Sequence, residues 1–340
     1  MSNETLYVAT DDGWTLALHL YPGFGPKRRH PVVMVHGMGA NRLHFDLNER
    51  HSLARAAQAR GFDTWVVELR GAGLTLAPGG RSRSLYQWGF ADYAERDMPT
   101  AVSYVLERSG SRQVHAVGHS LGGMLCYHLA TAAPAQLRSV TTVGSPLASH
   151  LALGGRERRV LQLAASLGPV TTFTPTPQRR VPLRRVLGAA AMFGAWSTRL
   201  VDNFALNAAN CEPQTLAQLA REGIDDVPIR LVADLAYAQG QRGSSSLFAY
   251  EERLGTLLAP VLVMGGSVDR IATPASVGEA VARMGGPDVR WRQLGRVHGD
   301  AHDYGHVDLI IGRSAPEEVY LPIVDFLLEH DLAEADTLVA

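Results

Sequence analysis

The stretch "HAVGHSLGGML" (residues 115–125) joins a strand-like pattern to a helix-like pattern through Gly118, Ser120 and Gly122. The apolar run "RQVHAVG" before the serine is typical of a buried strand, whereas "SLGGMLCYHLATAAP" has helical character and runs into a proline. Because glycine has no Cβ, glycines on both sides of the serine allow the two elements to approach closely around a strained turn. The sequence therefore predicts a strand, a sharp turn that presents the Ser120 hydroxyl, and a helix.

Similar apolar runs on both sides of this unit predict one sheet. Two β-rich runs around Asp-Gly, residues 5–10 and 15–21, predict an opening hairpin. Continuous apolar runs suit parallel strands buried on both faces, and they occur at residues 31–35, 63–69, 112–118, 140–144, 260–266 and 289–294. Helical patterns lie between them at residues 52–61, 90–110, 120–134 and 315–330. This alternation predicts an α/β fold with a mostly parallel central sheet flanked by helices.

The alternation breaks after about residue 146, where the chain becomes rich in alanine and leucine. Residues 181–201 and 213–223 have the pattern of helices. Insertions in α/β folds often emerge at the carboxyl ends of the strands, where ligands bind. Ordinary packing helices are the alternative. We expect an inserted helical cap at 147–255 and a core formed by residues 1–146 and 256–340.

The composition of the 340-residue chain argues against several classes of protein. A net charge of −1 at pH 7 argues against non-specific electrostatic binding to nucleic acid or to anionic lipid. Cys126 and Cys211 are the only cysteines, which argues against a disulfide framework. The segment "MSNETLYVATDDGW" has no apolar signal region, and no run has the length and character of a membrane span. We expect a cytoplasmic protein, and its single lysine, Lys27, among many arginines is typical of a GC-rich bacterium.

Two backbone N–H groups are expected next to the Ser120 hydroxyl. Leu121 opens the predicted helix, where unpaired N–H groups and the helix dipole favour negative charge. Met38 lies in the loop "HGMGAN" directly after the strand at 31–35, where a second donor is expected. A plain glycine turn is the alternative for this loop. Together the two donors would form an oxyanion hole, in which the loss of one donor typically costs about 3 kcal/mol.

The motifs "VHGMG", "ELRGAG", "GHSLGG" and "VLVMGGSVDRIATP" resemble those of the α/β-hydrolase superfamily. In that superfamily the catalytic residues follow the order serine, acid, histidine, and the acid follows the strand after the cap. The resemblance implies Ser120 as nucleophile and Asp269 as acid. A turn or helix-cap role is the alternative for Asp269. Asp225 and Asp226 are the alternative acids, but both fall inside the expected cap.

The segment "YGHVDLIIGRSAPEEVYLPIVDFL" (residues 304–327) resembles the acid-lipase group, which includes gastric and lysosomal lipases and has bacterial and plant relatives. In that group the catalytic histidine precedes x-Asp, an apolar stretch, a glycine and a final helix, which implies His306 as the base. Residues 45–73 also resemble the group. The chain departs from it because no signal peptide is visible, leucine follows the serine where glutamine is usual, and the cap matches none that we can name. Triacylglycerol specificity is therefore not implied.

Three histidines crowd this region, His298, His302 and His306. We interpret the first two as polar loop residues. The rival hypothesis is a zinc or iron site formed by His302, Asp303, His306 and Asp308. A spacing of four residues favours a metal site only on a helix, and the glycines in this stretch make it a poor helix. The sequence therefore favours a catalytic base over a metal ligand.

These residues predict acyl transfer to water without a metal or an organic cofactor. His306 takes the proton of Ser120 as the serine attacks an ester carbonyl, and Asp269 orients the imidazole. The same residues would serve a thioesterase, an acyltransferase, a lactonase or a C–C bond hydrolase, or a receptor-like protein with slow turnover. Dehalogenases and epoxide hydrolases of this fold normally use an aspartate nucleophile, so the serine argues against them.

The expected substrate is a small-molecule ester with an apolar acyl or alcohol group. Aromatic residues of the cap are the candidate pocket residues, with packing as the alternative: Phe173, Phe193, Trp196 and Phe204. A cluster of arginines suits either an anionic substrate or a solvated helix face: Arg179, Arg180, Arg184 and Arg185. The sequence does not predict an oligomeric state.

Overall fold

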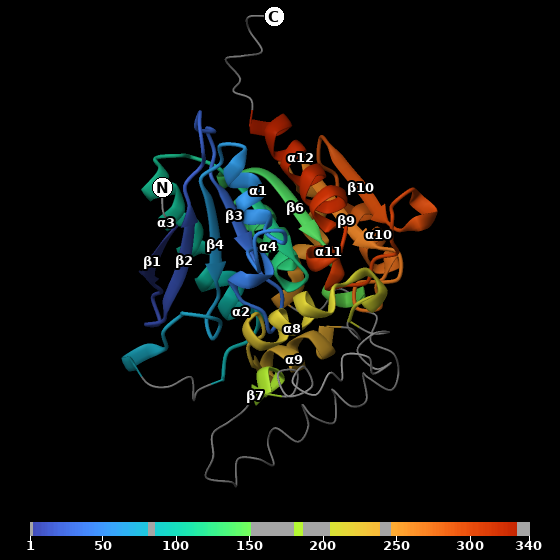
Figure 1. Cartoon of the computed structure of the whole chain (residues 1–340). Coiled ribbons are helices and arrows are strands. Elements are labelled where there is room, and N and C mark those ends of the chain that lie inside the picture. Colours follow the sequence, from blue (N-terminus) through green and yellow to red (C-terminus); the bar gives the residue numbers. More distant parts are fainter. Residues whose placement is uncertain (1–2, 81–85, 151–179, 186–204, 239–245, 332–340) are drawn as a thin grey trace, which may run out of the picture.

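An eight-stranded sheet forms the centre of the computed structural model, which describes residues 3–80, 86–150, 180–185, 205–238 and 246–331 (Figure 1). The strand order is β1-β2-β4-β3-β5-β6-β9-β10. β2 pairs antiparallel with β1 and β4, and every other pairing in this sheet is parallel. The strands are β1 (Glu4–Ala9), β2 (Thr15–Tyr21), β3 (Val32–Val35), β4 (Thr64–Glu68), β5 (Val114–His119), β6 (Leu137–Val143), β9 (Val261–Gly266) and β10 (Val289–Leu294). Each overlaps a predicted run, so the mostly parallel sheet is confirmed.

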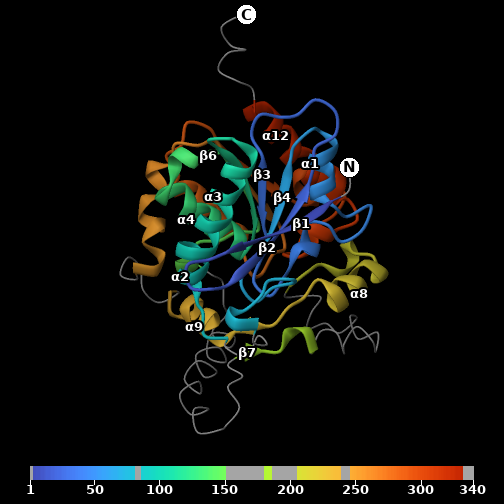
Figure 2. The same cartoon turned by 90° about the vertical axis from the view of Figure 1, so that its left-hand side faces the viewer.

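Helices cover both faces of the sheet. Figure 2 shows α3 and α4 on one face and α1 and α12 on the other. A π-helical turn, Tyr93–Asp97, joins α2 to α3, and another, Pro316–Tyr320, leads into α12. The helices are α1 (Leu53–Ala59), α2 (Phe90–Asp92), α3 (Met98–Ser109), α4 (Leu121–Ala132), α8 (Pro213–Glu222), α9 (Ile229–Ala238), α10 (Pro274–Arg283), α11 (Asp308–Ile311) and α12 (Leu321–Asp331).

The central strand β3 is apolar throughout because both of its faces are buried. In β3, Val33 and Val35 belong to the hydrophobic cluster on the side of α3 and α4. Their neighbours Val32 and Met34 belong to the cluster on the side of α1 and α12. Successive side chains of a strand point to opposite faces, so one short run supplies both cores.

The turn between β5 and α4 is tightly packed and strained. Ser120 has φ 54° and ψ −119°, and it is the one non-glycine residue with a positive φ in the described part of the chain. A Cβ at Gly122 would lie 2.0 Å from the carbonyl oxygen of Val35, and one at Gly118 would lie 2.4 Å from the carbonyl carbon of Gly122. Only glycine fits at these two positions, so α4 can start directly against the end of β3.

Three described elements of the chain between β6 and β9 lie at one end of the sheet. Figure 1 places α8, α9 and β7 together below the strands. β7 (Arg180–Val181) pairs antiparallel with β8 (Val227–Pro228), so the prediction of a helix from residue 181 is wrong at its start. The pairing of Val181 with Val227 overrides its local helical pattern. The predicted helix at 213–223 corresponds to α8, whereas residues 186–201 lie outside the described part.

Candidate active site

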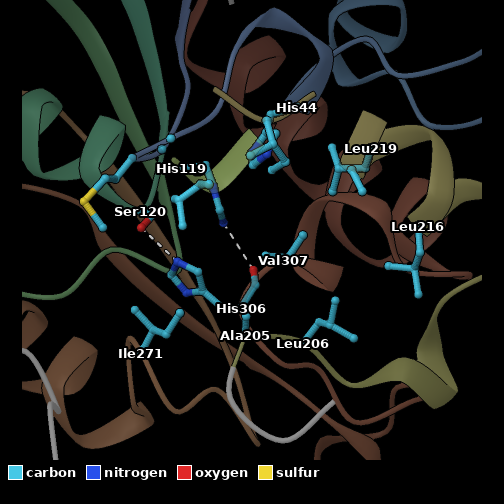
Figure 3. Close-up of a pocket in the computed structure, with 16 residues that line it drawn as sticks. His44, His119, Ser120, Ala205, Leu206, Leu216, Leu219, Ile271, His306 and Val307 are labelled. Carbon is cyan, nitrogen blue, oxygen red and sulfur yellow. Dashed lines mark hydrogen bonds between the residues drawn. The ribbon is translucent and has the colours of Figure 1, made fainter. Parts of the chain in front are cut away.

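The structure brings three of the predicted site residues into one hydrogen-bonded row. Figure 3 shows two of them, Ser120 and His306, with the hydrogen bond between them. Ser120 Oγ lies 2.8 Å from His306 Nε2, and His306 Nδ1 lies 2.8 Å from Asp269 Oδ2. A carboxylate accepts, so Nδ1 carries the imidazole proton and Nε2 is left to accept the hydroxyl proton. Asp269 is 2% exposed and His306 is 5% exposed, so solvent screens this row weakly.

Each member of the row follows a different strand. Ser120 is the turn after β5, Asp269 follows β9, and His306 lies in the loop between β10 and α11. The second oxygen of Asp269 accepts 2.8 Å hydrogen bonds from the backbone N–H groups of Ile271 and Ala272. These bonds fix the carboxylate so that its other oxygen faces the imidazole.

The loop after β3 lies directly beside the serine. A Cβ at Gly37 would lie 3.1 Å from the Cβ of Ser120. His36 holds this loop, because its Nε2 accepts a 3.2 Å hydrogen bond from Leu69 N–H and its Nδ1 donates to the carbonyl of Gly37 at 2.9 Å. Burial lowers the pKa of His36, which keeps the ring in this neutral form. Met38, one of the two predicted oxyanion donors, follows Gly37 in this loop and lines the same cavity as Ser120, and Leu121, the other, opens α4.

A cavity of about 370 Å³ adjoins the row. One wall comes from α8, where Leu216, Leu219 and Ala220 are spaced as one helical face. The sequence predicts this helix but not its place in the pocket wall, for which the apolar spacing is the available signal. The remaining lining residues are mostly apolar: Gly37, Met38, Gly39, His44, His119, Leu183, Ala205, Leu206, Ile224, Ile271 and Val307.

The cap residues proposed from sequence are only partly described. Phe173, Phe193, Trp196, Phe204 and Arg179 lie outside the described residues. The described arginines do not line the cavity. Arg180 forms a 2.8 Å salt bridge with Asp226 and lies over the ring of Tyr86, whereas Arg184 and Arg185 are exposed.

The alternative acids and the rival metal ligands have other partners. Asp225 accepts hydrogen bonds from Asn41 Nδ2 and Gly73 N–H. Asp303 accepts from Ser267 Oγ and from a backbone N–H, and His298 is exposed. Within the described ranges, the side chains close enough to share a metal ion are His30 with His115 and Asp331, and Asp288 with Glu329 and His330. Neither group contains a member of the metal set considered from sequence.

The order of these elements and the fold match known proteins over most of the chain. The family described as "alpha/beta hydrolase fold" matches residues 30–294. The chain belongs to this family. Within it, the chain is similar to lipase member K of Homo sapiens, with 23% identity over 374 residues that cover 96% of this chain and 88% of the relative. Gastric triacylglycerol lipase of Homo sapiens is 22% identical, with coverage of 96% and 88%.

Solved structures of alpha/beta hydrolases share the architecture. An esterase of Thermogutta terrifontis superposes with a TM-score of 0.63 at 18% identity, over 97% of this chain and all of the other. This likeness supports the fold alone. No helix in the described part of this alpha/beta hydrolase has the length and apolar character needed to cross a membrane.

Proposed function

We propose that the protein is a serine hydrolase that cleaves carboxylic esters carrying an apolar group. The observation that carries this proposal is the row of Ser120, His306 and Asp269 at the edge of an apolar cavity. The lipase and esterase relatives support a carboxylic ester hydrolase and a lipase- or esterase-type activity.

The reaction follows from the hydrogen bonds. His306 Nε2 removes the proton of Ser120 Oγ while Oγ attacks the ester carbonyl carbon. Asp269 stabilises the imidazolium that forms, and the N–H groups of Met38 and Leu121 stabilise the oxyanion. The imidazolium then protonates the leaving alkoxide, which gives an acyl-enzyme. Water, deprotonated by the same imidazole, releases the acid and restores the serine.

We further propose that residues 147–255 form a cap that supplies part of the substrate pocket. Leu216 and Leu219 on α8 support this, because they line the same cavity as Ser120.

A fluorophosphonate probe and a chain-length series of p-nitrophenyl esters test this function together. We expect the probe to label Ser120 and the enzyme to turn over the p-nitrophenyl esters many times. Because the cavity is apolar, esters with medium acyl chains should be hydrolysed faster than the acetate. Labelling without turnover, combined with retention of the ligand, would indicate a receptor-like protein instead. Absence of labelling would refute Ser120 as the nucleophile.

A further inference from the structure

The segment that follows α8 is hydrogen-bonded to the loop that carries Met38. Ala40 and Ile224 form an isolated antiparallel bridge between the two segments. Beside this bridge, the backbone N–H of Asp225 donates a 2.8 Å hydrogen bond to the carbonyl of Gly39. Gly39 directly follows Met38 in the chain. The backbone of the proposed cap is therefore bonded to the residue next to a predicted oxyanion donor.

Side chains of the proposed cap also pack on this loop. A Cβ at Gly39 would lie 2.9 Å from Val227 Cγ2 and 3.0 Å from Leu183 Cδ1. Both distances are shorter than the favourable separation of two carbon atoms, which is about 3.5–4.0 Å. The backbone beside Met38 therefore packs directly against the proposed cap.

The Asp225 side chain makes a third connection. Asp225 is 2% exposed, and its Oδ2 accepts hydrogen bonds from Asn41 Nδ2 at 3.2 Å and from Gly73 N–H at 2.8 Å. Asn41 Nδ2 also donates to the carbonyl of Glu222 at 2.8 Å. One buried carboxylate thus joins the loop after β3, the loop after β4 and the segment after α8.

Asp225 lies close to both predicted oxyanion donors without lining the cavity next to the serine. Together with Met38 and Leu121, it lines a separate small cavity of about 10 Å³. It is not among the described residues that line the cavity of about 370 Å³ beside Ser120. Any effect of its side-chain hydrogen bonds on the reaction must therefore pass through the residues that these bonds hold in place.

We propose that Asp225 is a positioning residue for the oxyanion hole, and that it fixes the loop so that the Met38 N–H faces the developing oxyanion. Donors stabilise an oxyanion well only when they are held in place before the reaction. A displacement of about 1 Å can cost about 10²-fold in rate, even when its cause lies far from the reacting atoms. This inference rests on the proposed ester hydrolysis, and it gives the segment after α8 a role in that reaction.

Two substitutions of Asp225 separate its hydrogen bonds from its charge. Asp225→Ala removes the acceptor, and we expect kcat for p-nitrophenyl octanoate to fall about 10–100-fold with a small change in KM. Removal of a whole oxyanion donor typically costs more, about 10²–10³-fold. Asp225→Asn keeps an acceptor oxygen for Asn41 and Gly73, so its kcat should stay close to the wild-type value.

The matched control is Asp226→Ala, which changes the next residue in the chain. Asp226 forms a 2.8 Å salt bridge with Arg180 and accepts a hydrogen bond from the backbone N–H of Arg184. Both of these partners belong to the proposed cap and not to the loop of Met38. This variant should therefore keep a kcat close to that of the wild type.

A second variant approaches the same contact from the loop. Asn41→Ser removes the Nδ2 donor that Asp225 accepts, but it keeps an oxygen that can accept from the N–H of Leu43, as Asn41 Oδ1 does. The turn that begins at Leu43 therefore keeps its cap. We expect kcat to fall in this variant as well, but by less than in Asp225→Ala.

A pair of ketone inhibitors reports on the oxyanion hole itself. Ser120 Oγ adds to the carbonyl carbon of octyl trifluoromethyl ketone while His306 takes the serine proton, which leaves a hemiketal oxyanion in the hole. Octyl methyl ketone adds far less readily. The preference for the fluorinated ketone, measured as the ratio of the two inhibition constants, should fall in Asp225→Ala by about the same factor as kcat. A merely structural role would lower the amount of folded enzyme but leave this ratio and the pH profile of kcat/KM unchanged.

The outcomes separate this proposal from the proposed function. No turnover of any ester by the wild-type protein would refute the ester hydrolase and the positioning role with it. Wild-type turnover, together with an unchanged kcat and ketone ratio in folded Asp225→Ala, would refute the positioning role alone. If Asp225→Ala does not fold, an unchanged ketone ratio in Asn41→Ser would refute it.

Two further results would also overturn the positioning role. Equal losses of kcat in Asp225→Asn and Asp225→Ala would show that the negative charge, and not the hydrogen bonds, matters to the reaction. An equal loss in Asp226→Ala would show that any weakening of the cap lowers activity.

Discussion

The carboxylate of Asp308 accepts a 3.0 Å hydrogen bond from the backbone N–H of Asn207, which lies 101 residues earlier in the chain. The same carboxylate accepts 3.0 Å bonds from Asn210 Nδ2 and from Gly305 N–H. One buried side chain therefore joins the loop that carries His306 to a segment of the proposed cap. The Asp of the sequence motif His-x-Asp has a structural role that its spacing alone did not reveal.

Asp308→Ala is expected to weaken both the fold and the site. It leaves three N–H donors without their acceptor in a buried place, and each such loss costs about 1–3 kcal/mol. We expect the free energy of unfolding in urea to fall by about 3 kcal/mol and kcat to fall at least tenfold. Asp325→Asn on the exposed face of α12 is the control and should change stability by less than about 1 kcal/mol. Equal effects of the two variants would contradict the joining role.

Ser120→Ala is expected to abolish ester hydrolysis. Loss of a serine nucleophile typically lowers kcat by about 10⁴–10⁶-fold while binding and fold persist. The thermal unfolding midpoint should stay within a few degrees of the wild type. Ser111→Ala, in the loop before β5, is the matched serine control and should keep full turnover and fluorophosphonate labelling. Near-normal turnover in folded Ser120→Ala would refute the nucleophile.

Asp269→Asn is expected to keep the shape of the site but to disturb the imidazole. An amide can present its N–H to His306, which favours the tautomer with the proton on Nε2 and blocks removal of the Ser120 proton. We expect kcat to fall about 10³–10⁴-fold with a small change in KM. The control is Asp303→Asn, which changes a nearby loop carboxylate with other partners. Its kcat should fall less than tenfold. A similar loss in both variants would indicate a general charge effect.

The sequence predicted the strands well because apolar runs buried on both faces carry their own signal. It also placed Ser120 on a turn, since the two flanking glycines are a local requirement of the close packing against β3. The roles of Ser120, His306 and Asp269 remain predictions, although the structure brings them together. These residues were found through motif spacing and a family resemblance, both of which are properties of short segments.

The features that could not be predicted from the sequence depend on contacts between distant segments. His44 and His119 are 75 residues apart in the sequence. Nothing in the segment around His44, "RLHFDL" (residues 42–47), indicates a buried, unpaired imidazole. Val181 is a strand residue only because Val227 lies beside it. The pocket face of α8 was present as an apolar spacing, but such spacing does not say which neighbour it meets.

Gly122→Ala is expected to damage the turn at the serine. Its Cβ would lie 2.0 Å from the carbonyl oxygen of Val35, so α4 must move away from β3. We expect a loss of several kcal/mol in stability or failure to fold. Gly278→Ala within α10 is the matched control, because its Cβ would meet nothing within 4 Å. Alanine is the better helix former, so this control should gain about 0.5–1 kcal/mol in urea denaturation.

Buried neutral histidines are expected to make the fold sensitive to acid. Burial lowers the pKa of His44 to about 3 and that of His115 to about 4, whereas the unfolded chain titrates near 6.5. Between these values the unfolded state binds more protons, so stability is complete above pH 6.5 and falls as the pH falls toward 4. For each such histidine, the free energy of unfolding should fall by about 1.4 kcal/mol between pH 7.5 and pH 5.5. His44→Phe should therefore reduce the pH dependence of unfolding by about that amount, whereas His298→Phe on the exposed loop should not. An unchanged pH dependence in His44→Phe would mean that the His44 ring takes up a proton inside the folded protein.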